Sequence, residues 1–264
     1  MTEGPRTWIA TLRRSHDNLA SLVEPMTPEQ VRGQSYCRDW TNAQVLSHLG
    51  SGAEIALLML PGALGEGPPA SRDAFPPVWD VWNAKSPDDQ AADAIASDEQ
   101  HVQRLEQLTD EELAAARLDF LGMQLDATGI IRLRLGEHVL HSWDVAVMRD
   151  PAATVQADAV ELLIDNVPQF LAPRLGKPLP EPFRVRITTT APERDYLLSS
   201  GESVSVVNWP GEYAAGDESV PHVAMPAEAL LRLSYGRMDP EHTPASVTGD
   251  PEVLGKLRAM FPGF

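Results

Sequence analysis

The segment Asp126–Arg149 reads DATGIIRLRLGEHVLHSWDVAVMR and is expected to form a long helix. Apolar residues occupy more than one face of a helix built from it, so we expect this helix to lie buried at the centre of a bundle. Glu137 and His141 are four residues apart and therefore project from one face. An ionised glutamate on so apolar a helix needs a cation or another strong partner. The segment predicts a helical core with a polar site in it.

Helical spacing of apolar residues continues on both sides of this segment, across residues 1–175. Thr41 with Gln44, and Thr109 with Glu112, form capping boxes that mark two helix starts. Pro61 followed by Gly62 is expected to end the helix that Thr41 opens. The expected helices cover about 6–23, 41–60, 78–85, 86–108, a short stretch from 109, 126–149 and 154–175.

The periodicity changes after residue 176. Phe183–Thr188 alternates between apolar and polar residues, as a half-buried strand does. The expected strands are 183–188, 196–199, 204–209 and 220–225, and the expected helices are 226–235 and 250–261. We therefore expect an α + α/β protein with two domains, a helical bundle over 1–175 and a smaller mixed α/β domain over 176–264 that closes over it.

Composition excludes several classes of protein. The 264 residues carry a formal net charge of −17, and both halves are acidic, so a surface for nucleic acid or an anionic membrane has no electrostatic basis. The single cysteine, Cys37, cannot form an internal disulfide, and the N-terminus lacks the apolar core of a signal peptide. The longest apolar run, Ile55–Leu60, is too short to cross a bilayer. These features predict a cytoplasmic protein.

His48 is a candidate third ligand beside the Glu137/His141 pair. His48 lies on the helix that Thr41 opens, in a stripe with Val45, Gly52 and Ile55 that is expected to face inward. Three protein ligands with open positions are the arrangement of catalytic rather than structural zinc sites. The alternative is a packed core histidine beside an ordinary helix pair. The order Glu-x-x-x-His differs from that of zinc proteases, and no nucleophile elbow, phosphate loop or dinucleotide fingerprint occurs.

Several short motifs, in order, resemble one known family. They are Cys37-Arg38-Asp39-Trp40-Thr41 leading into Val45-Leu46-Ser47-His48-Leu49, then Glu137-x-x-x-His141-x-Trp143-Asp144, and finally Leu230–Arg237 followed by Val247–Asp250. This pattern is similar to the mycothiol-dependent maleylpyruvate isomerase family over nearly the whole chain. The resemblance implies an N-terminal DinB-like metal-binding helical bundle and a sterol-carrier-like C-terminal α/β domain.

The resemblance also implies a chemistry. His48, Glu137 and His141 fall on the positions that hold a divalent metal, usually zinc, in such bundles. Family members use mycothiol, a low-molecular-weight thiol, as cosubstrate for a small-molecule substrate. An open zinc ion favours the nucleophilic thiolate form of a bound thiol. In the isomerase reaction the thiolate adds to a conjugated double bond, rotation follows, and the thiol leaves.

Two further residues are candidate catalytic residues. Asp144 lies three residues after His141 and is expected to orient its imidazole; a plain helix salt link is the alternative. Arg237, in a Gly-Arg turn, is expected to hold a carboxylate of the substrate or the thiol, the alternative being a structural arginine. We expect His16 to pack in the core or line the pocket, and His138 to be structural. The remaining histidines, His101, His222 and His242, are expected at the surface.

The preferred function is therefore a zinc-dependent enzyme that uses mycothiol. It isomerises a maleylpyruvate-like acid or transfers the thiol to an electrophile. Two alternatives remain open at this point. A metal-dependent hydrolase would need Asp144 or His16 as a general base. A non-catalytic protein would bind a small apolar ligand and hold a structural metal.

Overall fold

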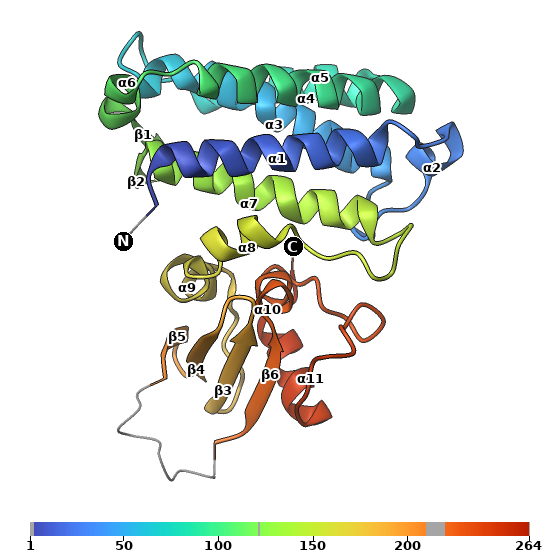
Figure 1. Ribbon diagram of the computed structural model, residues 1–264, viewed down its shortest axis with the longest axis vertical. Helices are drawn as coiled ribbons and strands as arrows, with labels where there is room; N and C mark the ends of the chain where they lie inside the picture. The colour runs from blue at the N-terminus through green and yellow to red at the C-terminus, as the bar shows by residue number, and fades with distance from the viewer. Residues whose placement is uncertain (1–2, 121, 210–219, 264) are drawn as a thin grey trace. The chain divides into compact units, whose positions relative to one another are not determined.

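The computed structural model describes residues 3–120, 122–209 and 220–263. The chain divides into two compact units, Met1–Ala153 and Thr154–Phe264. The first is mainly helical and the second contains a small mixed sheet, which confirms the α + α/β class (Figure 1). Residues 154–175, expected in the first domain, group with the second unit, because their helices pack against α10 and the sheet.

Four long helices form the bundle of the first unit. Helix α3 packs against α5 and α7, and α1 packs against the same two helices from the other side (Figure 1). The deeply buried positions of α7 include Leu135, Leu140 and Val145, as its apolar sequence predicts. The four helices are α1 (Pro5–Val23), α3 (Asn42–Ala63), α5 (Pro87–Glu106) and α7 (Ala127–Ala146).

Shorter elements connect these helices. They are α2 (Pro28–Arg32), the 3₁₀ turn η1 (Arg72–Ala74), α4 (Phe75–Ala84), α6 (Asp110–Ala115) and the antiparallel hairpin β1 (Arg117–Phe120) with β2 (Met123–Asp126). Helix α2 and the hairpin were not predicted from the sequence. Each strand has only four residues, and a single buried residue per strand, Leu118 or Leu125, gives no readable alternation.

The predicted caps are present. Thr41 and Thr109 each accept a hydrogen bond from the third helical residue, and Gln44 and Glu112 bond back to the cap. The prediction that Pro61 ends α3 is wrong, because the helix continues to Ala63. A proline removes only one amide donor, and the Leu64 amide still donates to the Leu60 carbonyl.

Helix α3 lies close to its neighbours. A Cβ on Gly50 would lie 2.2 Å from the Trp82 ring and 2.9 Å from Cα of Ala94. Trp82 is buried, whereas Trp79 is 45% exposed. By length and composition, α3 is also apolar enough to span a membrane, although 56% of its most apolar stretch is buried within the protein, as in the core helix of a bundle.

The second unit contains a four-stranded sheet in the order β5-β4-β3-β6. The pairs β3–β4 and β4–β5 are antiparallel, and β3–β6 is parallel. The predicted strands are all present. The sheet is formed by β3 (Phe183–Thr190), β4 (Arg194–Ser200), β5 (Val204–Asn208) and β6 (His222–Pro226), followed by α10 (Ala227–Ser234) and α11 (Pro251–Met260).

The single helix expected over 154–175 is wrong. The structure has α8 (Ala157–Leu163), a π-helical turn η2 (Val167–Leu171) and α9 (Ala172–Leu175). Pro168 and Pro173 explain the division, since each lies in the first turn of a new piece, where a missing amide donor is tolerated.

Candidate metal centre

Three side chains from two helices converge in the first unit. His48 comes from α3, and Glu137 and His141 come from α7, which packs against α3. One potential ligand atom from each lies within 4.8 Å of the others. Glu137 Oε2 is 3.2 Å from His48 Nε2 and 3.6 Å from His141 Nε2. Glu137 and His141 lie on the same face of α7 because they are four residues apart, and the packing of α3 on α7 brings His48 to them.

The cluster opens toward solvent on one side. The side chains of His48 and Glu137 are 39% and 48% exposed, whereas that of His141 is 11% exposed. A cation held here would therefore have protein ligands on the inner side and room for a small molecule on the outer side. Such openness distinguishes catalytic from structural metal sites.

Asp144 fixes the orientation of His141. The His141 Nδ1–H donates to Asp144 Oδ2 at 2.8 Å, and the Asp144 side chain is fully buried. This contact leaves Nε2 directed at Glu137, so the orienting contact expected from the sequence is present. A histidine that donates one ring nitrogen to a carboxylate is typical of metal-binding histidines.

The loop before α3 completes the surroundings of the cluster. Cys37 Sγ donates to Asp144 Oδ2 at 3.2 Å, so Cys37, His141 and Asp144 form a second group of potential ligands. The Trp40 ring lies 5.3 Å from the His48 ring and 6.1 Å from the His141 ring, centroid to centroid. No role was predicted for Trp40 from the sequence. Its position one residue before the Thr41 cap was the available signal.

Electrostatics in the metal-free cluster favour an ion pair. Desolvation would raise the pKa of Glu137, but hydrogen bonds from His141 and His48 outweigh it and hold that pKa far below its ordinary value. Desolvation likewise lowers the pKa of His141, but its hydrogen bonds with Asp144, Cys37 and Glu137 raise the pKa to about 10. A cation that binds these ligands therefore displaces a proton from His141.

His16 and His138 lie away from this cluster, in the core of the bundle. His16 Nδ1 faces Asp98 Oδ2 at 2.9 Å, and His138 Nε2 faces the same oxygen at 2.8 Å. His138 is thus structural, as expected, and His16 packs in the core. The prediction that His101 lies at the surface is wrong: it is 3% exposed, and burial lowers its pKa to about 3. His222 is exposed, as expected, and His242 is partly buried.

Arg237 belongs to the second unit and follows α10. It is 7% exposed, and its Nη1 donates to the Tyr235 carbonyl at 3.1 Å. Arg232 in turn donates to the Arg237 carbonyl at 3.1 Å while pairing with Glu228. The turn that carries Arg237 is therefore held by a buried ion pair.

The donor set of the cluster fits a divalent cation. Two imidazoles and one carboxylate suit zinc and other divalent transition metals, and the hydrogen bond from His141 Nδ1 to Asp144 leaves Nε2 directed at Glu137. The negative carboxylate would also offset part of the cation's charge. The residues present therefore fit the metal that the resemblance implies.

The fold and this cluster define a class of protein, in which a helical bundle with a histidine–carboxylate centre is joined to a small mixed α/β unit. Residues 12–146 match the family model described as the mycothiol maleylpyruvate isomerase N-terminal domain. That match covers half of the chain, and the chain belongs to this family.

Two solved structures resemble the whole chain. A crystal structure of the mycothiol-dependent maleylpyruvate isomerase shares 15% identity over 95% of both chains, with a TM-score of 0.68. A crystal structure of a variant of that isomerase, with one histidine replaced by alanine, shares 14% identity over 95% of both chains, with a TM-score of 0.67. At these identities the likeness establishes the fold. No functionally curated protein matches the chain.

Proposed function

We propose that this protein is an enzyme that uses mycothiol and a divalent metal, preferably zinc, held by His48, Glu137 and His141. The observation that carries the proposal is the convergence of these three side chains within 4.8 Å, in a member of the mycothiol maleylpyruvate isomerase family. The reaction is the isomerisation of a maleylpyruvate-like acid or the transfer of the thiol to an electrophile. The partners are this small substrate and the thiol, in the cytoplasm.

The metal's contribution is to favour the thiolate form of a thiol beside it. The thiolate sulfur then adds to the conjugated double bond of the acid, and the electron pair moves onto the adjacent carbonyl. Rotation about the new single bond and departure of the thiolate restore the double bond in the trans geometry, with no net change in atoms. In a transfer reaction the sulfur would instead stay on the electrophile.

The chain's own residues have distinct tasks in this proposal. Asp144 holds His141 with Nε2 toward the site, and the Trp40 ring lies beside the rings of His48 and His141. Arg237 binds a carboxylate of the substrate or the thiol, because a guanidinium pairs with a carboxylate through two parallel hydrogen bonds. An acidic protein needs such a local cation to bind a dianionic acid.

The positions of the candidate general bases do not favour the hydrolase alternative. Its candidate bases were Asp144 and His16. The Asp144 carboxylate is fully buried and accepts hydrogen bonds from His141 and Cys37, whereas His16 faces Asp98 and Glu99. Neither side chain is placed to activate a water molecule at the His48 cluster.

Metal analysis combined with a thiol-consumption assay tests the proposal. The purified protein is expected to bind about one equivalent of zinc and to turn over an unsaturated acid with mycothiol much faster than with glutathione, because binding contacts to the sugar hydroxyls would be missing. Equal rates with both thiols would contradict mycothiol recognition.

Substitution of the ligands tests the site itself. His48→Ala and His141→Ala should each lose most of the bound zinc while keeping their helical content. The matched control is His222→Ala, because this histidine is exposed and lies in the second unit. Full zinc occupancy in His48→Ala would overturn the ligand assignment.

A further inference from the structure

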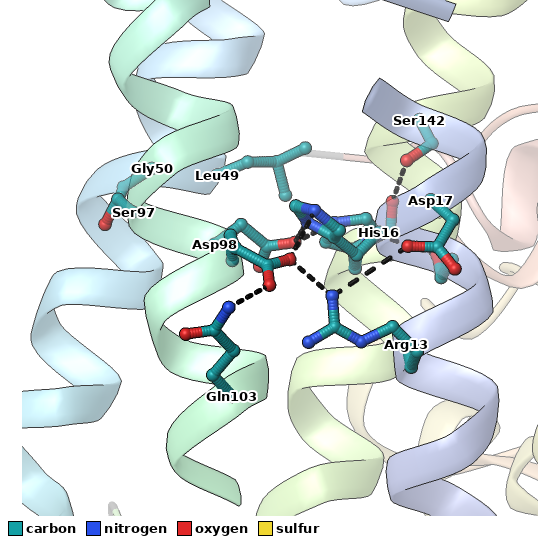
Figure 2. A network of polar contacts seen from close by, with 12 residues as sticks. Arg13, His16, Asp17, Leu49, Gly50, Ser97, Asp98, Gln103 and Ser142 are labelled. Carbon is teal, nitrogen blue, oxygen red and sulfur yellow. Dashed lines mark hydrogen bonds and ion pairs between the residues drawn. The ribbon is translucent and has the colours of Figure 1, made fainter. Parts of the chain in front are cut away.

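A second cluster of polar side chains lies buried inside the bundle. Asp98 of α5 is fully buried, and its carboxylate receives contacts from two other helices, α1 and α7 (Figure 2). Oδ2 faces His16 of α1 and His138 of α7, and Oδ1 accepts from Nη2 of Arg134, also on α7, at 2.7 Å. We call Asp98, His16, His138 and Arg134 the Asp98 network.

The network touches both helices that carry the candidate ligands. The same Arg134 nitrogen that donates to Asp98 also donates to the backbone carbonyl of Leu49 on α3, at 2.9 Å. Leu49 follows His48 directly in the chain. On α7, Arg134 lies three residues before Glu137, and His138 follows Glu137. One guanidinium nitrogen therefore ties the ligand-bearing turn of α3 to the ligand-bearing stretch of α7.

The local sequence makes this tie possible. Gly52 lies one turn after His48, and a Cβ on Gly52 would lie 3.0 Å from Arg134 Nη1. The missing side chain leaves space for the guanidinium to reach the α3 backbone. Asp98 then holds the guanidinium in place, since the arginine side chain is only 10% exposed and its charge needs a buried partner.

From this geometry we propose that Asp98, acting through Arg134, is the positioning residue of the metal centre. It sets α3 against α7 so that His48 meets Glu137 and His141. This inference rests on the proposed metal site. Ligands must be held to within a fraction of an ångström for tight binding. The hydrogen bond from Arg134 to the Leu49 carbonyl joins the backbone beside His48 to the helix that carries Glu137 and His141.

Asp98→Asn tests the proposal, with zinc affinity measured by competition against a chromophoric chelator. The amide oxygen can replace Oδ2 toward both histidines, but the amide nitrogen would then face the Arg134 guanidinium, so the tie should break. We expect zinc binding to weaken by at least about tenfold, the lower end of the effect of removing supporting contacts around a metal. The visible absorption of bound Co²⁺ should change as well.

A double variant separates positioning from stability. Asp98→Asn with Arg134→Met removes both buried charges, so much of the stability should return, as when a buried ion pair is replaced by uncharged groups. The tie to Leu49 stays absent, so zinc affinity should stay low. Recovery of stability together with wild-type zinc affinity would overturn the proposal, because the role of Asp98 would then be structural only. The double variant also decides the matter if Asp98→Asn does not fold.

The matched control is Leu105→Ala, a buried apolar position two turns further along α5. It should lose stability but change zinc affinity by no more than about twofold, because distant sites act independently. Wild-type affinity and an unchanged Co²⁺ spectrum in Asp98→Asn would overturn the positioning role alone. Equal zinc binding by the wild-type and His48→Ala proteins would instead overturn the metal site, and with it this inference.

Discussion

The Nδ1–H of His141 donates to the buried carboxylate of Asp144 at 2.8 Å, three residues further along the same helix. The contact fixes which ring nitrogen faces Glu137 and His48. It is formed within one helix, so it does not depend on how α3 packs. The orientation of one candidate ligand is thus built into the local sequence of α7.

Replacement of Asp144 by Asn or Ala should weaken metal binding. Without the carboxylate, the His141 ring loses its orienting acceptor, and supporting contacts of this kind change metal affinity by about 10- to 100-fold. Asp144→Asn should lose less than Asp144→Ala, because its amide oxygen still accepts from Nδ1. Zinc affinity and the ¹⁵N shifts of His141 measure the effect. Wild-type affinity in Asp144→Ala would show that Asp144 does not support the ligand.

Loss of Arg237 should reduce turnover without loss of metal. Arg237→Ala is expected to lower kcat/KM by about 10- to 100-fold, the equivalent of one hydrogen bond to a charged group. Arg237→Lys should recover little, because an ammonium cannot pair with a carboxylate through two parallel hydrogen bonds. The exposed Arg184 of the same unit provides the control variant Arg184→Ala. Near-normal kinetics in Arg237→Ala would mean that the anion is held elsewhere.

The Asp98 carboxyl should make the bundle sensitive to acid. Burial would raise its pKa, but the charges on His138 and Arg134 and the hydrogen bonds from His138 and His16 hold the pKa well below the usual range. A lowered pKa in the folded state contributes stability above the unfolded pKa of about 4 and loses it as the pH falls further.

Urea unfolding followed by helical circular dichroism tests this effect. Between about pH 4 and 2, Asp98→Asn should show a shallower fall of unfolding free energy, by up to about 1.4 kcal/mol per pH unit for one carboxyl. At neutral pH the variant should be less stable by about 3–5 kcal/mol, since Arg134 is left as an unpaired buried charge. Parallel pH profiles for the two proteins would contradict the role of Asp98 in acid stability.

Gly50→Ala should destabilise the first unit. The added methyl would lie 2.2 Å from the Trp82 ring and 2.9 Å from the backbone of Ala94, so helices α3, α4 and α5 must move apart. Overpacking of this kind costs about 1–3 kcal/mol. The control is Gly255→Ala in α11, where a Cβ meets nothing within 4 Å; it should gain up to about 1 kcal/mol from helix propensity. Thermal unfolding of both variants measures the difference.

Much of the fold could be predicted from local sequence. Caps such as Thr41 and Thr109 depend on residues three positions apart, and the four strands of the second unit follow from alternation and turns. The β1–β2 hairpin could not be predicted, because its strands are too short for a period. The π-helical turn at Val167–Leu171 was not predicted either. Pro168 lies in the first turn of this element, and a proline in the sequence does not by itself show whether a new helical segment begins there.

The sequence by itself determined the candidate ligands on α7 and the contact that orients one of them, because Glu137, His141 and Asp144 are related by helical spacing alone. Only the tertiary structure decided that His48 meets them, that the Trp40 ring lies beside the two imidazoles, and that Asp98 pairs with Arg134. These relations join residues from different helices, so they depend on helix packing. Packing is set by the complementarity of whole side-chain surfaces, such as Gly50 against Trp82, which no local periodicity encodes.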